Sequence, residues 1–158
     1  MPRAGADLAL LLLAGFRSMV DAVVVELARR GYKDVRPVHA FAMRAIVAGA
    51  DSASELGRRL SVSKQAAAKT IAVLQERGYI ERATDPYDAR RKRFQVTKLG
   101  LTVLREGQSI FDDLRRRWAR QIGSAELKSL ENHLSTLVGP SPIRRDDTPG
   151  WLASGLDK

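Results

Sequence analysis

The chain has 158 residues, of which 44% are hydrophobic and 28% charged, a composition typical of a protein that folds around its own core. It has no cysteine, which excludes disulfides and thiolate metal sites, and two histidines are too few for a histidine-rich metal site. The net charge of +9 predicts an anionic partner, with nucleic acid favoured over an anionic membrane surface.

The first predicted element is a long helix from residue 7 to about residue 30, ended by Gly31. Apolar residues recur at helical spacing from Leu8 to Leu27, and further leucines and valines widen the stripe beyond one face. Such a helix is buried on more than one side, and a second subunit is a natural source of the second covering surface. The apolar run from Leu8 to Leu13 is too short to span a bilayer, so we expect a cytoplasmic protein without membrane contact.

Three shorter helices are predicted next, over residues 36–48, 52–60 and 64–77. Ser52 and Glu55 fit a capping box, in which Ser52 caps the helix and Glu55 reaches back to the Ser52 amide. Ser63 is a second N-cap. The last two helices are joined by a tight turn at Ser61 and therefore have the spacing of a helix-turn-helix.

The second helix of this pair is predicted to enter the major groove of DNA. Ala67, Ile71 and Leu74 are spaced to face the core, which leaves the opposite face for base edges. Gln pairs with adenine, Ala contacts the thymine methyl group, and Lys contacts phosphate or guanine. The residues expected to contact DNA here are Ser61, Ser63, Lys64, Gln65, Ala66 and Lys69. Arginines expected at nearby phosphates are Arg58, Arg59 and Arg77. The alternative is two packed helices with a solvated basic face.

A β-hairpin with a basic tip is predicted after the helix pair. Residues 79–83 and 94–96 are the expected strands, and Asp85-Pro86 is a turn signal. Residues 58–93 hold ten Lys and Arg against four Asp and Glu, so two thirds of the net charge lies in this window. In an alternating strand Arg91 and Arg93 would lie on one side, with Arg90 and Lys92 on the other. A basic hairpin of this kind suits a groove lined with phosphates.

Two further helices are predicted, over residues 98–122 and 125–138. Both have an apolar face at helical spacing, and Gly123 separates them. Residues 139–158 are rich in Pro, Gly and Asp and are expected to form a flexible tail. The predicted fold class is therefore mainly α with a small β-hairpin wing.

The helix pair and the wing carry three motifs: Glu55-Leu56, Leu74-x-x-x-Gly78-Tyr79-Ile80, and Asp85-Pro86-x-Asp88-x-Arg90 followed by Val96-Thr97-x-x-Gly100. With these motifs, residues 8–138 resemble the MarR (multiple-antibiotic-resistance regulator) family of bacterial winged-helix transcription factors. The wing motif is the most specific of the three. The flanking helices match the family by length and position and not by motif.

The resemblance implies a homodimer in which the first and last helices interleave. Residues 1–34 and 101–138 are then a helical dimerisation region around a winged helix-turn-helix domain at residues 35–100. It also implies that Arg90 enters the minor groove while Asp88 fixes the wing loop. The expected wing contacts are Asp88, Arg90, Arg91, Lys92 and Arg93. A dimer predicts a pseudo-palindromic operator with half-sites about one helical turn apart.

Many proteins of this family respond to small aromatic or anionic ligands bound between the dimerisation helices and the winged helix. The residues that could line such a site here are Phe16, Met19, His39, Met43, Arg44 and Trp118. Each of them also fits ordinary core packing or a solvated face. The expected partners are double-stranded DNA, a second copy of the chain and such an effector, with no cofactor and no metal.

The function predicted from these features is a sequence-specific transcriptional regulator, a ligand-responsive repressor. The alternative is a winged-helix module that binds protein without specific DNA binding. The basic wing discriminates between the two, because a protein-binding module has no need for the run Arg90 to Arg93. An enzyme is disfavoured, because no Ser/His/Asp arrangement, phosphate-binding glycine loop or pair of carboxylates in a pocket is evident.

Overall fold

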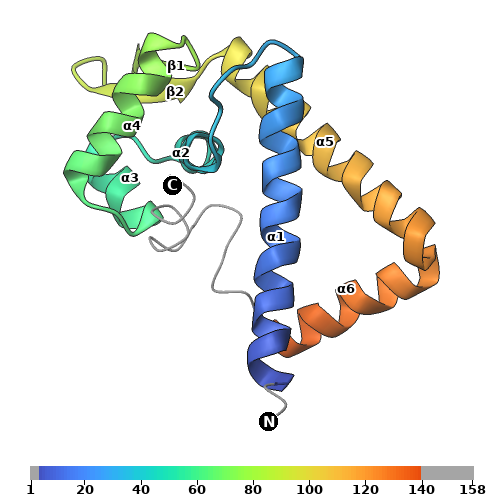
Figure 1. The fold of residues 1–158 in the computed structure, drawn as a ribbon. Helices are drawn as coiled ribbons and strands as arrows, with labels where there is room; N and C mark the ends of the chain where they lie inside the picture. Colours follow the sequence, from blue (N-terminus) through green and yellow to red (C-terminus); the bar gives the residue numbers. More distant parts are fainter. Residues whose placement is uncertain (1–3, 140–158) are drawn as a thin grey trace.

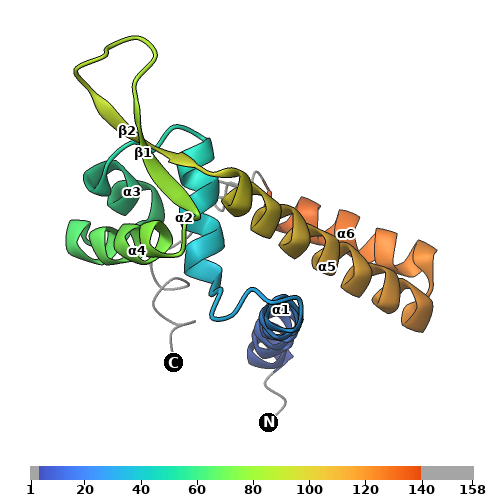
Figure 2. The same ribbon diagram turned by 90° about the horizontal axis from the view of Figure 1, so that it is seen from above.

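The computed structural model describes residues 4–139, and its helices form a compact head and three long arms (Figure 1). The head contains three helices and a β-hairpin: α2 (Pro37–Val47), α3 (Ala53–Leu60), α4 (Lys64–Glu76), β1 (Ile80–Thr84) and β2 (Lys92–Val96). The arms are α1 (Ala4–Arg29), α5 (Lys98–Ile122) and α6 (Ser124–Val138). Figure 2 shows the hairpin projecting from the head on one side, while α5 and α6 extend away on another. The predicted mainly helical, winged class is confirmed.

The head folds around apolar side chains that α2, α3 and α4 each turn inward. Ala67, Ile71 and Leu74 are buried as their spacing predicted, and they share one core with Met43 and Leu56, both 0% exposed. Burial of each large side chain of this kind stabilises the fold by roughly 1.5–3 kcal/mol. The inward stripe of α4 thereby determines which of its faces is left for a partner.

The turn between α3 and α4 depends on a glycine. A Cβ atom at Gly57 would lie 2.9 Å from the backbone oxygen of Val62, closer than side-chain atoms pack. Ser61 takes the left-handed conformation, with φ of 54°, and ends α3. The close approach of the two backbones lets the helix pair keep its tight turn.

The predicted helix caps are present, with one correction. The Ser52 hydroxyl accepts a hydrogen bond from the Glu55 amide at 3.2 Å, and the Ser63 hydroxyl accepts one from the Ala66 amide at 3.0 Å. The predicted return bond, from the Ser52 amide to the Glu55 carboxylate, was wrong. The Glu55 carboxylate instead accepts hydrogen bonds from Arg58 at 2.7 Å and Arg59 at 2.8 Å, and these bonds lower the pKa of Glu55. Two guanidinium groups outcompete one backbone amide for a carboxylate.

The second strand of the hairpin is longer than predicted and its tip differs, whereas the first strand has the predicted length and is shifted by one residue. β1 and β2 pair antiparallel, with Ile80 opposite Val96 and Thr84 opposite Lys92. Arg90 lies in a turn before β2, so the prediction that the four basic residues alternate along one strand was wrong. The alternation holds only from Lys92, because local hydrogen bonds bend the chain before it.

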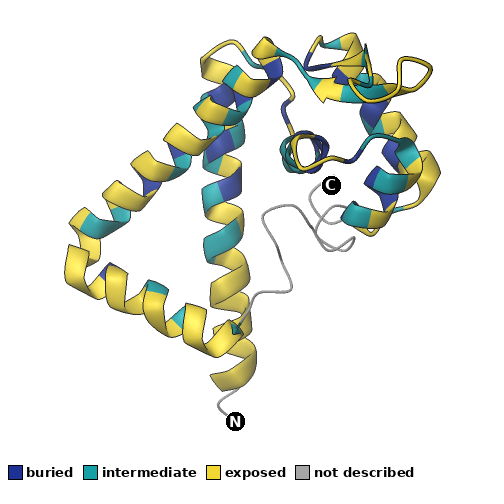
Figure 3. Ribbon diagram, turned by 180° about the vertical axis from the view of Figure 1, so that it is seen from behind, coloured by how far each residue is buried: buried dark blue, intermediate teal, exposed yellow. Residues whose placement is uncertain are grey.

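The arms do not bury their apolar residues as the head does. Val20, Val23 and Leu27 in the second half of α1 are buried, and α1 packs against α5. The first half is exposed, with Leu10 at 63% and Leu11 at 70% (Figure 3). The two-sided burial predicted for this helix is therefore absent within residues 4–139.

Helix α1 is long and apolar enough to cross a membrane by length and composition alone. The run from Leu8 to Leu13, too short to span a bilayer by itself, belongs to a continuous helix of 26 residues. Helices of water-soluble proteins also meet this criterion, so it does not establish a membrane span. The predicted tail, apart from Gly139, lies outside the described residues.

Candidate nucleic-acid interface

The outer face of α4 presents polar and small side chains opposite the buried stripe. Four residues of the predicted set are exposed on this helix, namely Lys64, Gln65, Ala66 and Lys69. Ser63 is also exposed, but its hydroxyl already accepts the capping bond from the Ala66 amide. Ser61 forms the turn through its backbone conformation. The structure thus brings the predicted residues to one edge of the head, with Ser61 and Ser63 in structural positions.

The wing loop is held by two aspartates. The Asp85 carboxylate accepts a hydrogen bond from the Tyr87 amide at 2.8 Å, and the Asp88 carboxylate accepts one from the Arg90 amide at 3.0 Å. The Arg91 amide donates to the Asp88 carbonyl oxygen at 3.0 Å. Side-chain bonds to an amide two residues ahead are typical of Asx turns, which stiffen short loops. Asp88 therefore makes the contacts of a residue that orders the loop around Arg90.

The basic residues of the wing have different environments. Within residues 4–139, no hydrogen bond or ion pair engages the guanidinium of Arg90, which is exposed at the turn. Arg91 forms an ion pair with Asp51, just before α3, and this pair connects the wing loop to the start of that helix. Lys92 donates to the Thr84 hydroxyl at 3.1 Å. Arg93 is partly buried, and its Nε atom is buried with no hydrogen-bond partner in the described part of the chain. Arg90 is the wing residue best placed to enter a groove.

Three arginines expected at phosphates also make contacts within the chain. Arg58 and Arg59 bond to Glu55, and Arg59 additionally donates to the carbonyl oxygen of Ala48 at 3.1 Å. Arg77 donates to the Asp34 carbonyl oxygen at 2.6 Å. These bonds hold the elements of the head together.

Sequence reasoning missed two exposed arginines of the head. Arg82 stacks over the Phe94 ring, with 5.0 Å between its guanidinium carbon and the ring centroid. Strand alternation places Arg82 on the same face of β1 as the buried Ile80, so the strand pattern carried no signal for its exposure. Arg36 lies immediately before Pro37, at the N-cap of α2. The prediction placed it inside the helix, so it was not considered as a binding residue.

A cavity of about 380 Å³ lies between the arms and the head. Its walls include Phe16 of α1, Phe41 of α2 and Phe111 of α5, and Arg36 and Arg44 are its cationic residues. Aromatic walls with a few charged groups are typical of small-molecule sites. Of the six residues predicted for a ligand site, the cavity brings together Phe16 and Arg44.

The other four predicted pocket residues do not line this cavity. Met43 is fully buried in the head, because α2 turns Met43 inward and Arg44 outward. The Nδ1 atom of His39 accepts a hydrogen bond from the Arg36 amide at 3.1 Å and caps α2. Met19 packs against the core, and the Trp118 ring lies next to Gly15 of α1. Phe41 was missed, although its spacing of three from Arg44 places it on the same helix face.

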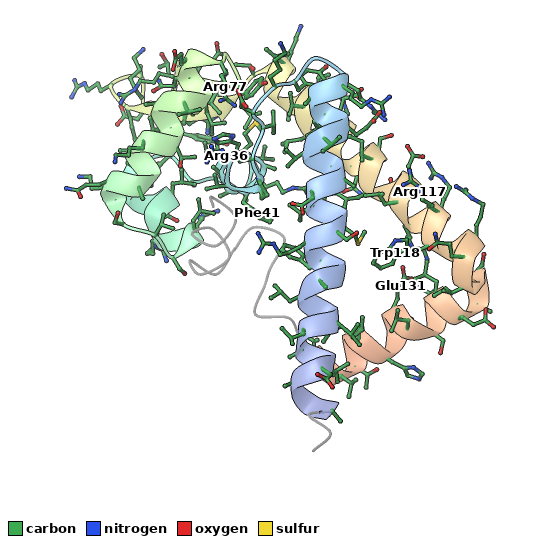
Figure 4. All side chains as sticks on the ribbon, in the orientation of Figure 1. Arg36, Phe41, Arg77, Arg117, Trp118 and Glu131 are labelled. Atoms are coloured by element: carbon green, nitrogen blue, oxygen red, sulfur yellow. The ribbon has the colours of Figure 1, made fainter. Side chains whose placement is uncertain are left out.

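Figure 4 separates the labelled side chains into two groups. Arg36, Phe41 and Arg77 lie in the head, whereas Arg117 and Trp118 on α5 and Glu131 on α6 lie on the arms. Among residues 4–139, no group of three or more His, Cys, Asp and Glu side chains is placed to hold a metal ion.

Comparison with known proteins agrees with this geometry. Residues 33–91 match the family model described as MarR family. FabT of Streptococcus pneumoniae, solved in complex with DNA, superposes with a TM-score of 0.66 and 20% identity over 84% of this chain and 93% of that chain. MepR of S. aureus, solved bound to ethidium bromide, superposes with a TM-score of 0.61 and 17% sequence identity over 82% of this chain and 93% of that chain.

A MarR-family transcriptional regulator from Rhodococcus sp. RHA1 gives a TM-score of 0.60 and 18% identity over 89% of this chain and 100% of that chain. At these identities the likenesses establish a shared fold. The resemblance to the MarR family that the helix and wing motifs predicted is therefore confirmed, by sequence over residues 33–91 and by fold over most of the chain.

Proposed function

We propose that this protein is a cytoplasmic, sequence-specific transcriptional regulator that binds DNA as a homodimer and acts as a ligand-responsive repressor. The observation that carries the proposal is the exposed face of α4 beside a wing whose Arg90 guanidinium is exposed and engages no other described residue. A helix of this kind fits the major groove, and an arginine on a thin hairpin suits the negative potential of a narrow minor groove.

The residues of α4 supply both kinds of contact that such a regulator needs. Gln65 has the amide group that pairs with an adenine edge, and Ala66 is small enough to let the helix approach a thymine methyl group. Lys64 and Lys69 supply charge for phosphates, which position the protein without reading sequence. Each good bidentate base contact discriminates against the wrong base by about 1–3 kcal/mol.

The homodimer is supported by the apolar surface of the arms. Exposed leucines occur on two arms, with Leu10 and Leu11 on α1 and Leu137 on α6 at 63%, 70% and 81% exposure. An apolar surface of this extent typically marks a protein or membrane contact. A second copy provides the matching surface through a two-fold axis, and residues 1–34 and 101–138 form the dimerisation region. Two copies would present two α4 helices to one operator.

Ligand response is supported by the position of the cavity. Phe16 and Phe111 belong to the arms, whereas Phe41 and Arg44 belong to the head. A ligand between them favours whichever relative placement of head and arms it fits best, and so changes the spacing of the two α4 helices. The aromatic walls and the arginines favour an aromatic anion.

Fluorescence anisotropy tests specific binding directly. The probe is a duplex from upstream of the protein's own gene, compared with a scrambled duplex at physiological salt. We expect tighter binding to the upstream duplex, and a loss of about tenfold with Arg90→Ala. Arg117→Ala is the matched control, because it removes an equal charge from an arm. Equal affinity for both duplexes contradicts the regulator proposal.

A further inference from the structure

A groove of about 450 Å³ lies between the start of α2 and one flank of α4. Three cationic residues line it from two segments of the chain: Arg36 before α2, and Lys69 and Arg77 within α4 and at its end. We call this the α2–α4 groove. Figure 4 shows Arg36 and Arg77 in this part of the head.

The α2–α4 groove is positive even after its acidic residue is counted. Asp34 and His39 also line it, and the Nδ1 atom of His39 accepts the bond from the Arg36 amide. One carboxylate against three cations leaves an excess of two positive charges. The bond from Arg77 to the Asp34 carbonyl oxygen holds that guanidinium at the groove. Such convergence suits an anion with several oxygens.

The position of the α2–α4 groove identifies the anion. Thr70 and Val73 of α4 line the groove, whereas Ala67 and Ile71 face the core and Gln65 faces outward. When the outer face of a recognition helix enters the major groove, its flanks lie beside the sugar-phosphate backbones that border that groove. The anion nearest to the α2–α4 groove is then a backbone phosphate of the duplex.

Arg36 belongs to two sites at once. It lines the α2–α4 groove together with Arg77, and it also lines the apolar cavity together with Phe41 and Arg44. One guanidinium cannot be aimed fully at anions in both places. An anion in the cavity therefore draws Arg36 away from the α2–α4 groove, and the two ligands weaken each other reciprocally.

We propose that the α2–α4 groove binds a backbone phosphate of the duplex, and that Arg36 makes this contact depend on whether an anion occupies the cavity. This rests on the proposed DNA-binding function. It adds a phosphate site that flanks α4 on the side of α2 and a route by which an effector weakens DNA binding.

The salt dependence of DNA binding tests the phosphate site. We expect Arg36→Gln to lower the slope of log K against log salt by roughly one unit, equally for upstream and scrambled duplexes. Asp34→Asn should act in the opposite direction, since it removes the one carboxylate that lines the groove within residues 4–139. Asn tolerates the backbone of this position, where φ is 56°. Arg117→Gln is the control and should leave the slope unchanged.

The two proposals fail in different ways. Unchanged slopes and affinities for both Arg36→Gln and Asp34→Asn overturn the phosphate site, even if the wild-type protein still prefers the upstream duplex. Loss of that preference in the wild-type protein overturns the regulator function itself.

The link through Arg36 is tested with a pair of probes that differ in charge. 1-Anilinonaphthalene-8-sulfonate gains fluorescence in apolar cavities, and N-phenyl-1-naphthylamine is its neutral counterpart without the sulfonate. We expect the sulfonate to weaken duplex binding by about fivefold or more in the wild-type protein and clearly less in Arg36→Gln. The neutral probe should act weakly on both. Absence of a fluorescence gain, or equal weakening of both proteins by the sulfonate, overturns the link.

Discussion

The head and the arms differ in where their apolar side chains go. In the head, Met43 and Leu56 are 0% exposed, whereas Leu10 and Leu11 on the first arm are 63% and 70% exposed. The head therefore buries its apolar side chains within one chain and exposes polar residues on the outer face of α4. Within residues 4–139 the arms leave apolar surface open, and this surface supports the proposed contact with a second copy. One chain thus combines a head that buries its apolar side chains with arms whose exposed apolar surface suits the proposed assembly.

The largest effect is expected from a cavity in the head. Leu74 is fully buried at the centre of the head core, so Leu74→Ala removes packing that no second copy can replace. We expect a loss of about 2–5 kcal/mol in the free energy of unfolding, measured by urea denaturation. Gln75→Ala, at the exposed neighbouring position, is the control. A loss below about 1 kcal/mol contradicts the view that the head carries its own core.

The next effect is expected from a charge on the open arm. Leu11→Glu should convert the dimer to a monomer in sedimentation velocity while leaving the helical circular dichroism intact. Duplex affinity should fall by about 100-fold, because the two recognition helices no longer bind as one unit. Val47→Glu, at an exposed apolar position of the head, should change neither the oligomeric state nor the duplex affinity.

The same experiment separates a second copy from a membrane as the partner of the arm. A wild-type protein that is monomeric at micromolar concentration and floats with anionic vesicles contradicts the dimer. Such an outcome assigns the exposed first half of α1 to contact with a bilayer.

Two glycines test the comparison on a finer scale. Gly57→Ala should destabilise the head by about 1–3 kcal/mol, because the added Cβ meets the Val62 oxygen at 2.9 Å. Gly107→Ala in α5 meets nothing within 4 Å and should stabilise the helix by about 0.4–1 kcal/mol. Thermal unfolding of both variants measures the two shifts. Shifts in Tm of the same sign for both variants contradict the difference in packing between head and arm.

The smallest effect is expected from an ion pair between two arms. Arg115 donates to the two Glu131 oxygens at 2.5 Å and 2.9 Å, and these bonds lower the pKa of Glu131. A lowered carboxyl pKa stabilises the folded state above the unfolded value of about 4.3, and the gain is lost as the pH falls through the folded value. Glu131→Gln should therefore lower Tm slightly at pH 7 and hardly at pH 3. Glu126→Gln is the control.

Features that depend on a few neighbouring residues were predictable from the sequence. The caps Ser52 and Ser63 and the inward stripe of α4 follow from contacts within four residues along the chain. The aspartates of the wing act over two residues, so their motif identified the loop as well. Local geometry is set by backbone hydrogen bonds and helical spacing, and both are legible in sequence.

Features that depend on distant residues were decided by the tertiary structure alone. Arg91 pairs with Asp51 forty positions away, and the Arg77 guanidinium bonds to the Asp34 carbonyl forty-three positions away. The direction of the Arg44 side chain could not be predicted from the sequence either, because packing of Met43 into the head determines the rotation of α2 about its axis. Sequence therefore predicted the α4 face and the wing as the DNA-binding elements, and the structure places the predicted α4 residues on an exposed face. Only the fold placed Arg36 between the cavity and the α2–α4 groove, since burial of the core sets which side chains converge.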